Sequence, residues 1–336
     1  MTKHLLAPSQ DLEDILMASE ASFLHLHSLK IMVFGGTGFI GKWLISALSL
    51  ANSKFNLEIL IVLASRDPQR AKSIFKHLKQ EHIMFVDVKE LDRPDIPHCD
   101  IYIHAATPTT NAEETLRSDP SSYIGITDFI VKSAGIAKNS PIVMHLSSGA
   151  VYGIQDMQTL LQLEQKLTIA NPSDRYTRAK LQIDNLLEVA QEEGLIRALS
   201  PRLFAFAGPQ LPLEEHFAVG NFVRDGMTGS PISVLGNSKT LRSYLYPSDL
   251  IHVLIEMLVK LPTQTINVGS DQSITMENLA TLVSEKTNRL PIQLLGEERE
   301  PSNYVPSNEN LRRYVTQKEF INIDEILERW LSWLKT

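Results

Sequence analysis

Tyr176 and Lys180 are the residues whose types and spacing point most directly to chemistry. Four positions apart in a helix, they share one face, so the lysine ammonium can lie beside the phenol. A free phenol has a pKa of about 10 and stays protonated at neutral pH. A unit charge about 4 Å away, at an effective dielectric of about 20, favours loss of that proton by roughly 4 kcal/mol, or about 3 pK units. The pair therefore predicts a tyrosine that exchanges a proton with a substrate hydroxyl.

Ser148 precedes this pair in the run Ser147-Ser148-Gly149-Ala150-Val151-Tyr152-Gly153, at the expected end of a strand. Its hydroxyl would hydrogen-bond the substrate oxygen that meets Tyr176 and orient it. A nucleophilic serine would need a Gly-x-Ser-x-Gly elbow, which is missing here. The ten histidines are scattered along the chain, so no metal is expected. Ser148, Tyr176 and Lys180 form the predicted catalytic set.

A glycine-rich loop at residues 35–41 follows the first apolar run and leads into a helix-like segment. Its glycines permit a tight turn, a close approach of the backbone to a pyrophosphate, and close packing of the helix on the sheet. The helix N-terminus would present free N–H groups to the anion. The loop predicts a dinucleotide site made by Gly35, Thr37, Gly38, Phe39, Ile40 and Gly41.

The end of the second apolar run bears on the choice between NAD and NADP. An NAD site normally places an acid there for the ribose hydroxyls, but this sequence has Ser65 followed by Arg66. A guanidinium can pair with a 2′-phosphate, which favours NADP(H) and leaves NAD(H) possible. Alternatively, Arg66 is a solvated residue and Asp67 takes the part of the acid. Further cofactor contacts are expected after the third and fourth strands, at Asp87, Val88, Ala105 and Ala106.

Six short apolar runs alternate with segments of helical periodicity. The strands are expected at Lys30–Phe34, Glu58–Ala64, Ile83–Val86, Ile101–His104, Ile142–Leu146 and Ile196–Leu199, with helices near 39–51, 68–79, 121–137 and 175–193. Strands that are apolar throughout are typical of a parallel sheet covered on both faces. The alternation predicts a doubly wound, Rossmann-type α/β domain over residues 30–205 that binds NAD(P).

Beyond this domain the rhythm becomes irregular and is interrupted by prolines. Residues 206–336 are expected to form a smaller, mixed substrate-binding lobe, with segments near 241–270 returning to the first domain. Its helices are predicted near 214–227, 248–260 and 275–287. Residues 1–29 predict a helical extension that begins with a capped helix at Ser9 and packs on the main body; docking of a partner is the alternative.

Composition excludes several classes of protein. The chain has 336 residues and a net charge of −7, so it offers no basic field for nucleic acid. No apolar run approaches the ~20 residues that span a bilayer, and the N-terminus does not read as a secretory signal. Its single cysteine, Cys99, excludes a disulfide scaffold and fits a reducing, cytoplasmic location.

These residues together resemble the extended short-chain dehydrogenase/reductases, in the branch of NAD(P)-dependent nucleotide-sugar epimerases, dehydratases and 4-ketoreductases. The resemblance covers about residues 30–335. Besides the glycine loop and the catalytic set it includes Pro201–Phe204, Gly208-Pro209, Leu241–Leu250 and Ile266–Gly269.

The resemblance implies a nucleotide-sugar substrate whose diphosphate is bound by Arg242, with Asn267 close by and Asn221 in the same role. An arginine fork matches two phosphate oxygens. The alternative for Arg242 is a surface ion pair. The resemblance also implies a homodimer paired through the helices near 121–137 and 175–193.

In the dehydratases of the branch that this chain resembles, the end of the fifth strand reads Ser-Thr-Asp-Glu-Val-Tyr-Gly. This sequence departs from that pattern. Gly149 and Ala150 replace the acid and base, and cannot move protons. The Glu of related decarboxylases is absent for the same reason, and no supporting Asn is visible at 123–125. What remains is 4-epimerisation through a transient ketone or 4-keto reduction, which need only hydride transfer and the Tyr176 relay.

Three alternatives stay open. The chain could be a 4,6-dehydratase-type enzyme, an alcohol dehydrogenase of the same fold that acts on non-sugar substrates such as steroids, or a non-catalytic dinucleotide-binding protein. The complete set of Ser148, Tyr176 and Lys180 argues against a non-catalytic protein. The segment around Arg242 argues against an apolar substrate.

Overall fold

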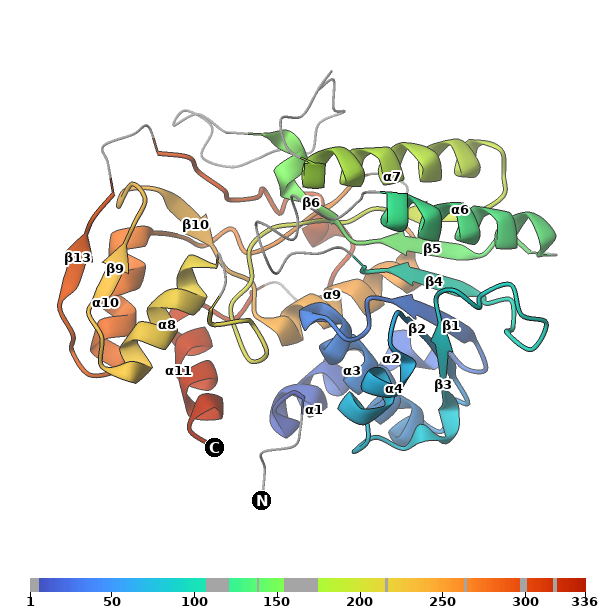
Figure 1. Ribbon diagram of the computed structural model, residues 1–336, viewed down its shortest axis with the longest axis horizontal. Coiled ribbons are helices and arrows are strands. Elements are labelled where there is room, and N and C mark those ends of the chain that lie inside the picture. The colour runs from blue at the N-terminus through green and yellow to red at the C-terminus, as the bar shows by residue number, and fades with distance from the viewer. Residues whose placement is uncertain are drawn as a thin grey trace.

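The computed structural model of the chain describes residues 6–106, 121–137, 139–153, 175–214, 217–262, 265–296, 301–316 and 319–336. A central sheet lies between two layers of helices, and a second group of short strands and helices lies beside it (Figure 1). The motifs predicted to bind a cofactor belong to the first part, and most of the later chain belongs to the second.

The central sheet has six parallel strands in the order β3-β2-β1-β4-β5-β7. Their bounds are β1 Lys30–Phe34, β2 Leu60–Ser65, β3 Ile83–Asp87, β4 Ile101–His104, β5 Ile142–His145 and β7 Arg197–Leu199. The strand order reverses between β1 and β4, and ligands of such sheets bind outside the strand ends at this point. The predicted doubly wound Rossmann-type sheet is confirmed.

Alternate residues of each strand enter two separate cores. Ile31 and Val33 of β1 belong to the core on one face, whereas Met32 and Phe34 belong to the core on the other. Each strand therefore buries both of its faces, which is why the runs are apolar throughout rather than alternating.

Helices cover both faces of the sheet. The helices are α1 Ser9–Ala18, α2 Glu20–Leu24, α3 Phe39–Phe55, α4 Pro68–Ile74, α6 Ser121–Ile136, α7 Arg175–Glu192, α8 Ala218–Thr228, α9 Pro247–Lys260, α10 Met276–Lys286 and α11 Ile323–Leu334. Short 3₁₀ turns occupy Gln80–His82, Gly149–Tyr152 and Leu311–Arg313. Helices α6 and α7 pack together on one face, and α3 packs with α9 on the other (Figure 1).

The second part of the chain is built from small sheets. Strands β6 Ser147–Ser148, β8 Arg202–Leu203 and β11 Asn267–Val268 pair in parallel, so β11 returns the chain to the edge of the first part. Strand β10 Leu241–Ser243 pairs antiparallel with β12 Ser273–Thr275, and β9 Ile232–Val234 pairs in parallel with β13 Ile292–Leu294. This mixed lobe packs α8 and α10 beside β9.

Two element boundaries differ from the expectation for local reasons. The second strand begins at Leu60 instead of Glu58, because Glu58 has a left-handed φ of +55° and the Asn52 side chain bonds both the N–H and the carbonyl of Ile59. The fourth helix ends at Ile74 rather than near 79, and Phe75 caps it.

Three further helix predictions are corrected. Helix α1 begins with Ser9 inside the helix and Pro8 as its cap, so Ser9 makes no side-chain cap. Helix α8 begins at Ala218, four residues later than expected. Helix α11 was not predicted, although Asn322 caps it by accepting the Glu325 N–H at 3.0 Å, and an Asn-x-x-Glu pattern was a readable signal.

The N-terminal extension is helical, as predicted, and docks on the main body. Leu12, Ile15 and Leu16 enter the same core as α3 and α9. The buried Asp11 carboxylate accepts hydrogen bonds from Tyr246 Oη at 2.6 Å and from Arg329 Nη1 at 2.7 Å. In the described part of the chain, no helix is both long and apolar enough to cross a membrane.

Candidate active site

A cavity of about 2220 Å³ opens where the carboxyl ends of the central strands meet the second lobe. Most of the predicted site residues line it. From the cofactor prediction these are Gly35, Thr37, Gly38, Phe39, Ile40, Gly41, Ser65, Arg66, Val88, Ala105 and Ala106, and from the catalytic and substrate predictions Ser148, Tyr176, Lys180, Asn221 and Arg242. Asp87 and Asn267 are not among the lining residues.

The glycine loop has the shape that a dinucleotide pyrophosphate requires. Gly35 has a φ of +80°, and a Cβ there would lie 2.5 Å from the Ala105 carbonyl oxygen. A Cβ at Gly41 would lie 2.3 Å from the Gly35 carbonyl oxygen. Gly38, at the start of α3, is exposed and leaves the backbone open to the cavity. The first N–H groups of α3 have no intrahelical partner, so this end of the cavity fits an anion.

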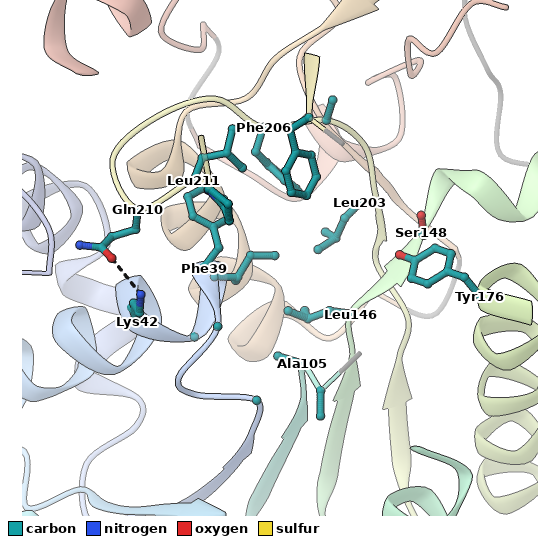
Figure 2. Close-up of a pocket in the computed structure, with 18 of the residues that line it drawn as sticks. Phe39, Lys42, Ala105, Leu146, Ser148, Tyr176, Leu203, Phe206, Gln210 and Leu211 are labelled. Atoms are coloured by element: carbon teal, nitrogen blue, oxygen red, sulfur yellow. Dashed lines mark hydrogen bonds between the residues drawn. The ribbon is translucent and has the colours of Figure 1, made fainter. Parts of the chain in front are cut away.

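Positively charged side chains surround the cavity at the end of β2. Arg66 is exposed and lines the cavity together with Arg70 and Lys42. Burial lowers the pKa of Lys42, and the neighbouring Arg70 charge lowers it further. Lys42 Nζ donates to Gln210 Oε1 at 2.9 Å (Figure 2). Asp67 accepts the Arg70 N–H at 2.9 Å and so caps α4.

Tyr176 and Lys180 lie on one face of α7, as predicted from their spacing. Lys180 Nζ lies 5.7 Å from the centre of the Tyr176 ring and donates to the Leu146 carbonyl oxygen at 2.5 Å. The Lys180 side chain is buried, and burial lowers its pKa to about 7, while the negative charge of Asp184 acts in the opposite direction. The ammonium thus acts on the phenol from inside the protein, where water screens it little.

Ser148 and Tyr176 approach each other from different elements. Figure 2 shows the Tyr176 ring reaching from α7 toward Ser148 at the end of β6. Ser148 Oγ accepts the Ala150 N–H at 3.1 Å and lies 3.5 Å from Tyr304 Oη. The hydroxyl groups of Ser148 and Tyr176 can therefore contact one substrate oxygen from two sides.

Tyr304 is a candidate that sequence reasoning missed. It lines the cavity, stacks on Phe204 at 4.6 Å, and donates from Oη to the Leu203 carbonyl oxygen at 3.3 Å. Burial is the main cause of its raised pKa, and the charge of the nearby Tyr176 raises it further. No local motif marks Tyr304; a bridge to Arg242 in β10 brings it to the site.

The predicted substrate residues are only partly brought together. Arg242 lines the cavity 5.9 Å from the Tyr304 ring centre and donates to the Leu241 carbonyl oxygen at 3.0 Å. Asn221 lines it from α8, and its Oδ1 accepts from Arg224 Nη1 at 3.1 Å. Arg224, another lining cation, was not anticipated.

The remaining two predicted residues lie elsewhere. Asn267 is buried in β11, where its Oδ1 accepts from Tyr152 Oη at 2.7 Å. Asp87 ends β3 and accepts the Lys89 N–H at 2.9 Å, so it closes a turn.

The ring of Phe204 occupies the space beside Gly149. A Cβ at Gly149 would lie 2.6 Å from the Phe204 ring, and that ring also packs 6.4 Å from Tyr152. A carboxylate side chain at position 149 would therefore need Phe204 to move. The position of the Phe204 ring therefore agrees with the absence of an acid at position 149.

Known proteins share both sequence and fold with this chain. A model of the NAD dependent epimerase/dehydratase family matches residues 31–269. UDP-glucuronic acid decarboxylase 3 of Arabidopsis thaliana is 26% identical over 271 residues, which cover 78% of this chain and 75% of that protein.

Two solved structures illustrate the similarity in fold. UDP-N-acetylglucosamine 4-epimerase from Methanobrevibacter ruminantium, in complex with UDP-N-acetylmuramic acid, has a TM-score of 0.75 and 18% identity, and the match covers 92% of this chain and 99% of that one. UDP-glucuronic acid 4-epimerase from Bacillus cereus, in complex with UDP-glucuronic acid and NAD, has a TM-score of 0.72 and 18% identity, covering 91% and 99%. At this identity the two matches establish the shared fold.

Proposed function

We propose, from the premise that this chain belongs to the NAD dependent epimerase/dehydratase family of nucleotide-sugar enzymes, that it catalyses 4-epimerisation or 4-keto reduction of a nucleotide-linked sugar. One observation carries the proposal: the glycine loop, Ser148, Tyr176 and Lys180 line a single cavity. The family includes epimerases and dehydratases, and the residues around Tyr176 favour some of these reactions over others.

Tyr176 is the proposed proton-transfer residue. In the oxidising direction its phenolate oxygen takes the proton from the sugar hydroxyl, and in the reducing direction its phenol gives that proton to the ketone oxygen. Lys180 favours the phenolate through its charge, 5.7 Å from the ring centre. Ser148 hydrogen-bonds the same substrate oxygen and holds it toward Tyr176.

The nicotinamide cofactor, when bound, supplies hydride acceptance and donation at the sugar carbon. The residues that would hold it are the glycine loop at the pyrophosphate, Arg66 at the adenosine end, and Ala105 and Ala106 under the nicotinamide ribose. The exposure of Gly38 to the cavity and the crowded positions of Gly35 and Gly41 support this placement.

A preference for NADP(H) is part of the proposal. Three cations, Arg66, Arg70 and Lys42, line the cavity and would attract a 2′-phosphate, although the carboxylates of Asp67 and Asp92 line it as well. Asp67, the alternative partner for the ribose, is engaged as the cap of α4. The Bacillus cereus epimerase was solved with NAD, so NAD(H) is the alternative that binding measurements must separate.

Arg242 is proposed to bind the substrate diphosphate, with Asn221 beside the same group. Both line the second-lobe end of the cavity, and Arg224 adds a further positive charge there. Asn267 is proposed to act indirectly, through Tyr152. This arrangement assigns residues 30–205 to the cofactor and 206–336 mainly to the substrate.

Dehydration and decarboxylation are the less supported reactions. Gly149 and Ala150 stand where those reactions use an acid and a base, and Phe204 fills the space that a side chain at position 149 would need. The Arabidopsis relative is a decarboxylase, but the residues beside Ser148 favour a reaction that needs only the Tyr176 relay.

A screen of nucleotide sugars tests the proposal. The purified protein is incubated with UDP-, dTDP- and GDP-linked sugars in the presence of NADP+ or NAD+, and with their 4-keto forms in the presence of NADPH or NADH. Loss of reduced cofactor identifies a reductase, and formation of an epimer without net cofactor loss identifies an epimerase. Carbon dioxide release, or elimination of water, would contradict the proposal.

A further inference from the structure

Asp184 extends the face of α7 that carries the proposed catalytic pair. Tyr176, Lys180 and Asp184 follow one another at four-residue intervals and so lie along one side of the helix. The Asp184 side chain is 16% exposed, and its Oδ2 accepts from Ser147 Oγ at 2.7 Å. The nearby Ser200 side chain also favours the charged form of this carboxylate. The Ser147 hydroxyl holds the carboxylate one helical turn beyond Lys180.

Several titratable groups from neighbouring elements face this part of α7. His145 Nε2, from β5, lies 3.9 Å from Asp184 Oδ1, and the His145 ring makes an edge contact with His104 from β4 at 5.1 Å. The charge of Arg202, from β8, lowers the pKa of Asp184. At the cavity end, the charge of Tyr176 raises the pKa of Tyr304. Asp184 therefore places a carboxylate among groups that are neutral or positively charged.

The surroundings favour loss of the charge on Lys180. Burial lowers the pKa of Lys180 to about 7, and burial together with the charge of Lys180 lowers the pKa of His145 well below its usual value. Burial also raises the pKa of Asp184, whereas its hydroxyl partners and the charges of Arg202 and Lys180 lower it. Among the described residues, Asp184 is the group whose negative charge favours the ammonium form of Lys180.

We propose that Asp184 is a positioning residue that favours the ammonium form of Lys180 beside Tyr176, and so shifts the pH range in which Tyr176 accepts a proton. It does not line the cavity, so it acts through Lys180 rather than on the substrate. This inference rests on the proposed roles of Tyr176 and Lys180.

The direct test follows the protonation of Tyr176 itself and needs no substrate. Protein with an isotope-labelled tyrosine Cζ is titrated by nuclear magnetic resonance, and the Tyr176 signal is assigned by its loss in Tyr176→Phe. In Asp184→Asn, which keeps a hydrogen-bond acceptor for Ser147 but removes the charge, Tyr176 is expected to lose its proton about one pH unit higher. Once a substrate is known, the acidic limb of kcat/KM should move by the same amount.

Two variants separate charge from structure. Glu188→Gln removes an exposed carboxylate one turn further along α7 and should leave the Tyr176 titration unchanged. Asp184→Glu keeps the charge and should stay close to the wild type. If Asp184→Asn does not fold, Ser147→Ala removes the hydroxyl that donates to the carboxylate and should shift the titration in the same direction.

The result that overturns the inference is a Tyr176 titration in Asp184→Asn that coincides with that of Glu188→Gln and the wild type. That result would leave the proposed reaction standing. Conversely, a chain that turns over no nucleotide sugar would still show whether Asp184 controls the charge beside Tyr176.

Discussion

Lys180 combines a proposed catalytic role with an energetic cost of burial. Its side chain is 3% exposed, and burial lowers its pKa from 10.5 to about 7. Between these two values the unfolded chain keeps a proton on Lys180 that the folded protein has released. The unfolded state then binds more protons, so the stability that depends on this residue rises with pH across the window.

This linkage predicts how the wild type compares with Lys180→Met. From about pH 7 to about pH 10, the unfolding free energy of the wild type minus that of the variant should rise by up to about 1.4 kcal/mol per pH unit. Chemical denaturation at several pH values measures the difference. Lys132→Met, an exposed change on α6, should give a flat difference. A flat or falling difference for Lys180→Met would show that the ammonium is not destabilised by burial.

A second prediction at the residue scale concerns Arg66, which is proposed to select NADP over NAD. Replacing it with alanine should weaken NADP binding about 10- to 100-fold, because a charge-assisted contact with the 2′-phosphate contributes about 1.5–3 kcal/mol. NAD binding should change far less. Lys72→Ala, an exposed cation on α4 outside the cavity, is the control, and titration calorimetry with both cofactors is the measurement. Equal losses for NAD and NADP would remove Arg66 from this role.

At the scale of elements, the loop between β1 and α3 depends on backbone shape more than on side chains. The left-handed φ of Gly35 and its approach to Ala105 join the loop to the end of β4. Any side chain at Gly35 strains the backbone and enters that contact. The loop thus connects the proposed cofactor site to the centre of the sheet.

Gly35→Ala should lower the melting temperature by several degrees and abolish most dinucleotide binding. Gly135→Ala is the matched control, because this glycine is exposed in α6 and a Cβ there meets nothing within 4 Å. The control should raise stability by up to about 1 kcal/mol. Thermal melts with and without cofactor compare the two. Unchanged binding in Gly35→Ala would contradict the placement of the pyrophosphate.

The same elements show how far sequence reasoning reaches. The six strands and their common edge follow from apolar runs, and the glycine loop, Ser148, Tyr176 and Lys180 follow from motifs that are local in the chain. Tyr304 carries no motif, since a tertiary contact with Arg242 brings it to the cavity. The predicted start of β2 was wrong, because the Asn52 side chain bonds the backbone of Ile59 and so overrides the apolar pattern. Motifs that are local in the chain thus predicted the candidate catalytic residues, whereas long-range packing determines which other side chains line the cavity.

At the scale of the whole molecule, the N-terminal helices brace the wall of the cavity. Asp11 of α1 bonds Tyr246, whose ring packs at 6.1 Å against Trp43 of α3. Trp43 Nε1 in turn donates to the Pro209 carbonyl oxygen at 3.0 Å, next to Gln210 at the cavity. This contact chain runs from the extension, which precedes the matched family region, to the turn that enters the second lobe.

The homodimer implied by the family resemblance remains a proposal, with exposed apolar residues on α6 and α7 as its support. Ile136 is 66% exposed, Leu186 38% and Val189 52%. The wild type should sediment as a dimer, and Val189→Glu should be monomeric, because burying an unpaired carboxylate in an apolar interface is costly. Leu294→Glu, equally exposed at 52% but on β13, should stay dimeric. A monomeric wild type, or a dimeric Val189→Glu, would exclude this interface.

The central claim is that Tyr176 moves the proton in a cavity that also holds the dinucleotide. The most direct measurement is the turnover rate and cofactor affinity of Tyr176→Phe, with the substrate found by the screen and Tyr314→Phe, a tyrosine outside the cavity, as control. The account predicts a loss of rate of about 10²- to 10⁴-fold with cofactor affinity within about twofold of the wild type. A Tyr176→Phe protein that turns over its substrate at nearly the wild-type rate would contradict it.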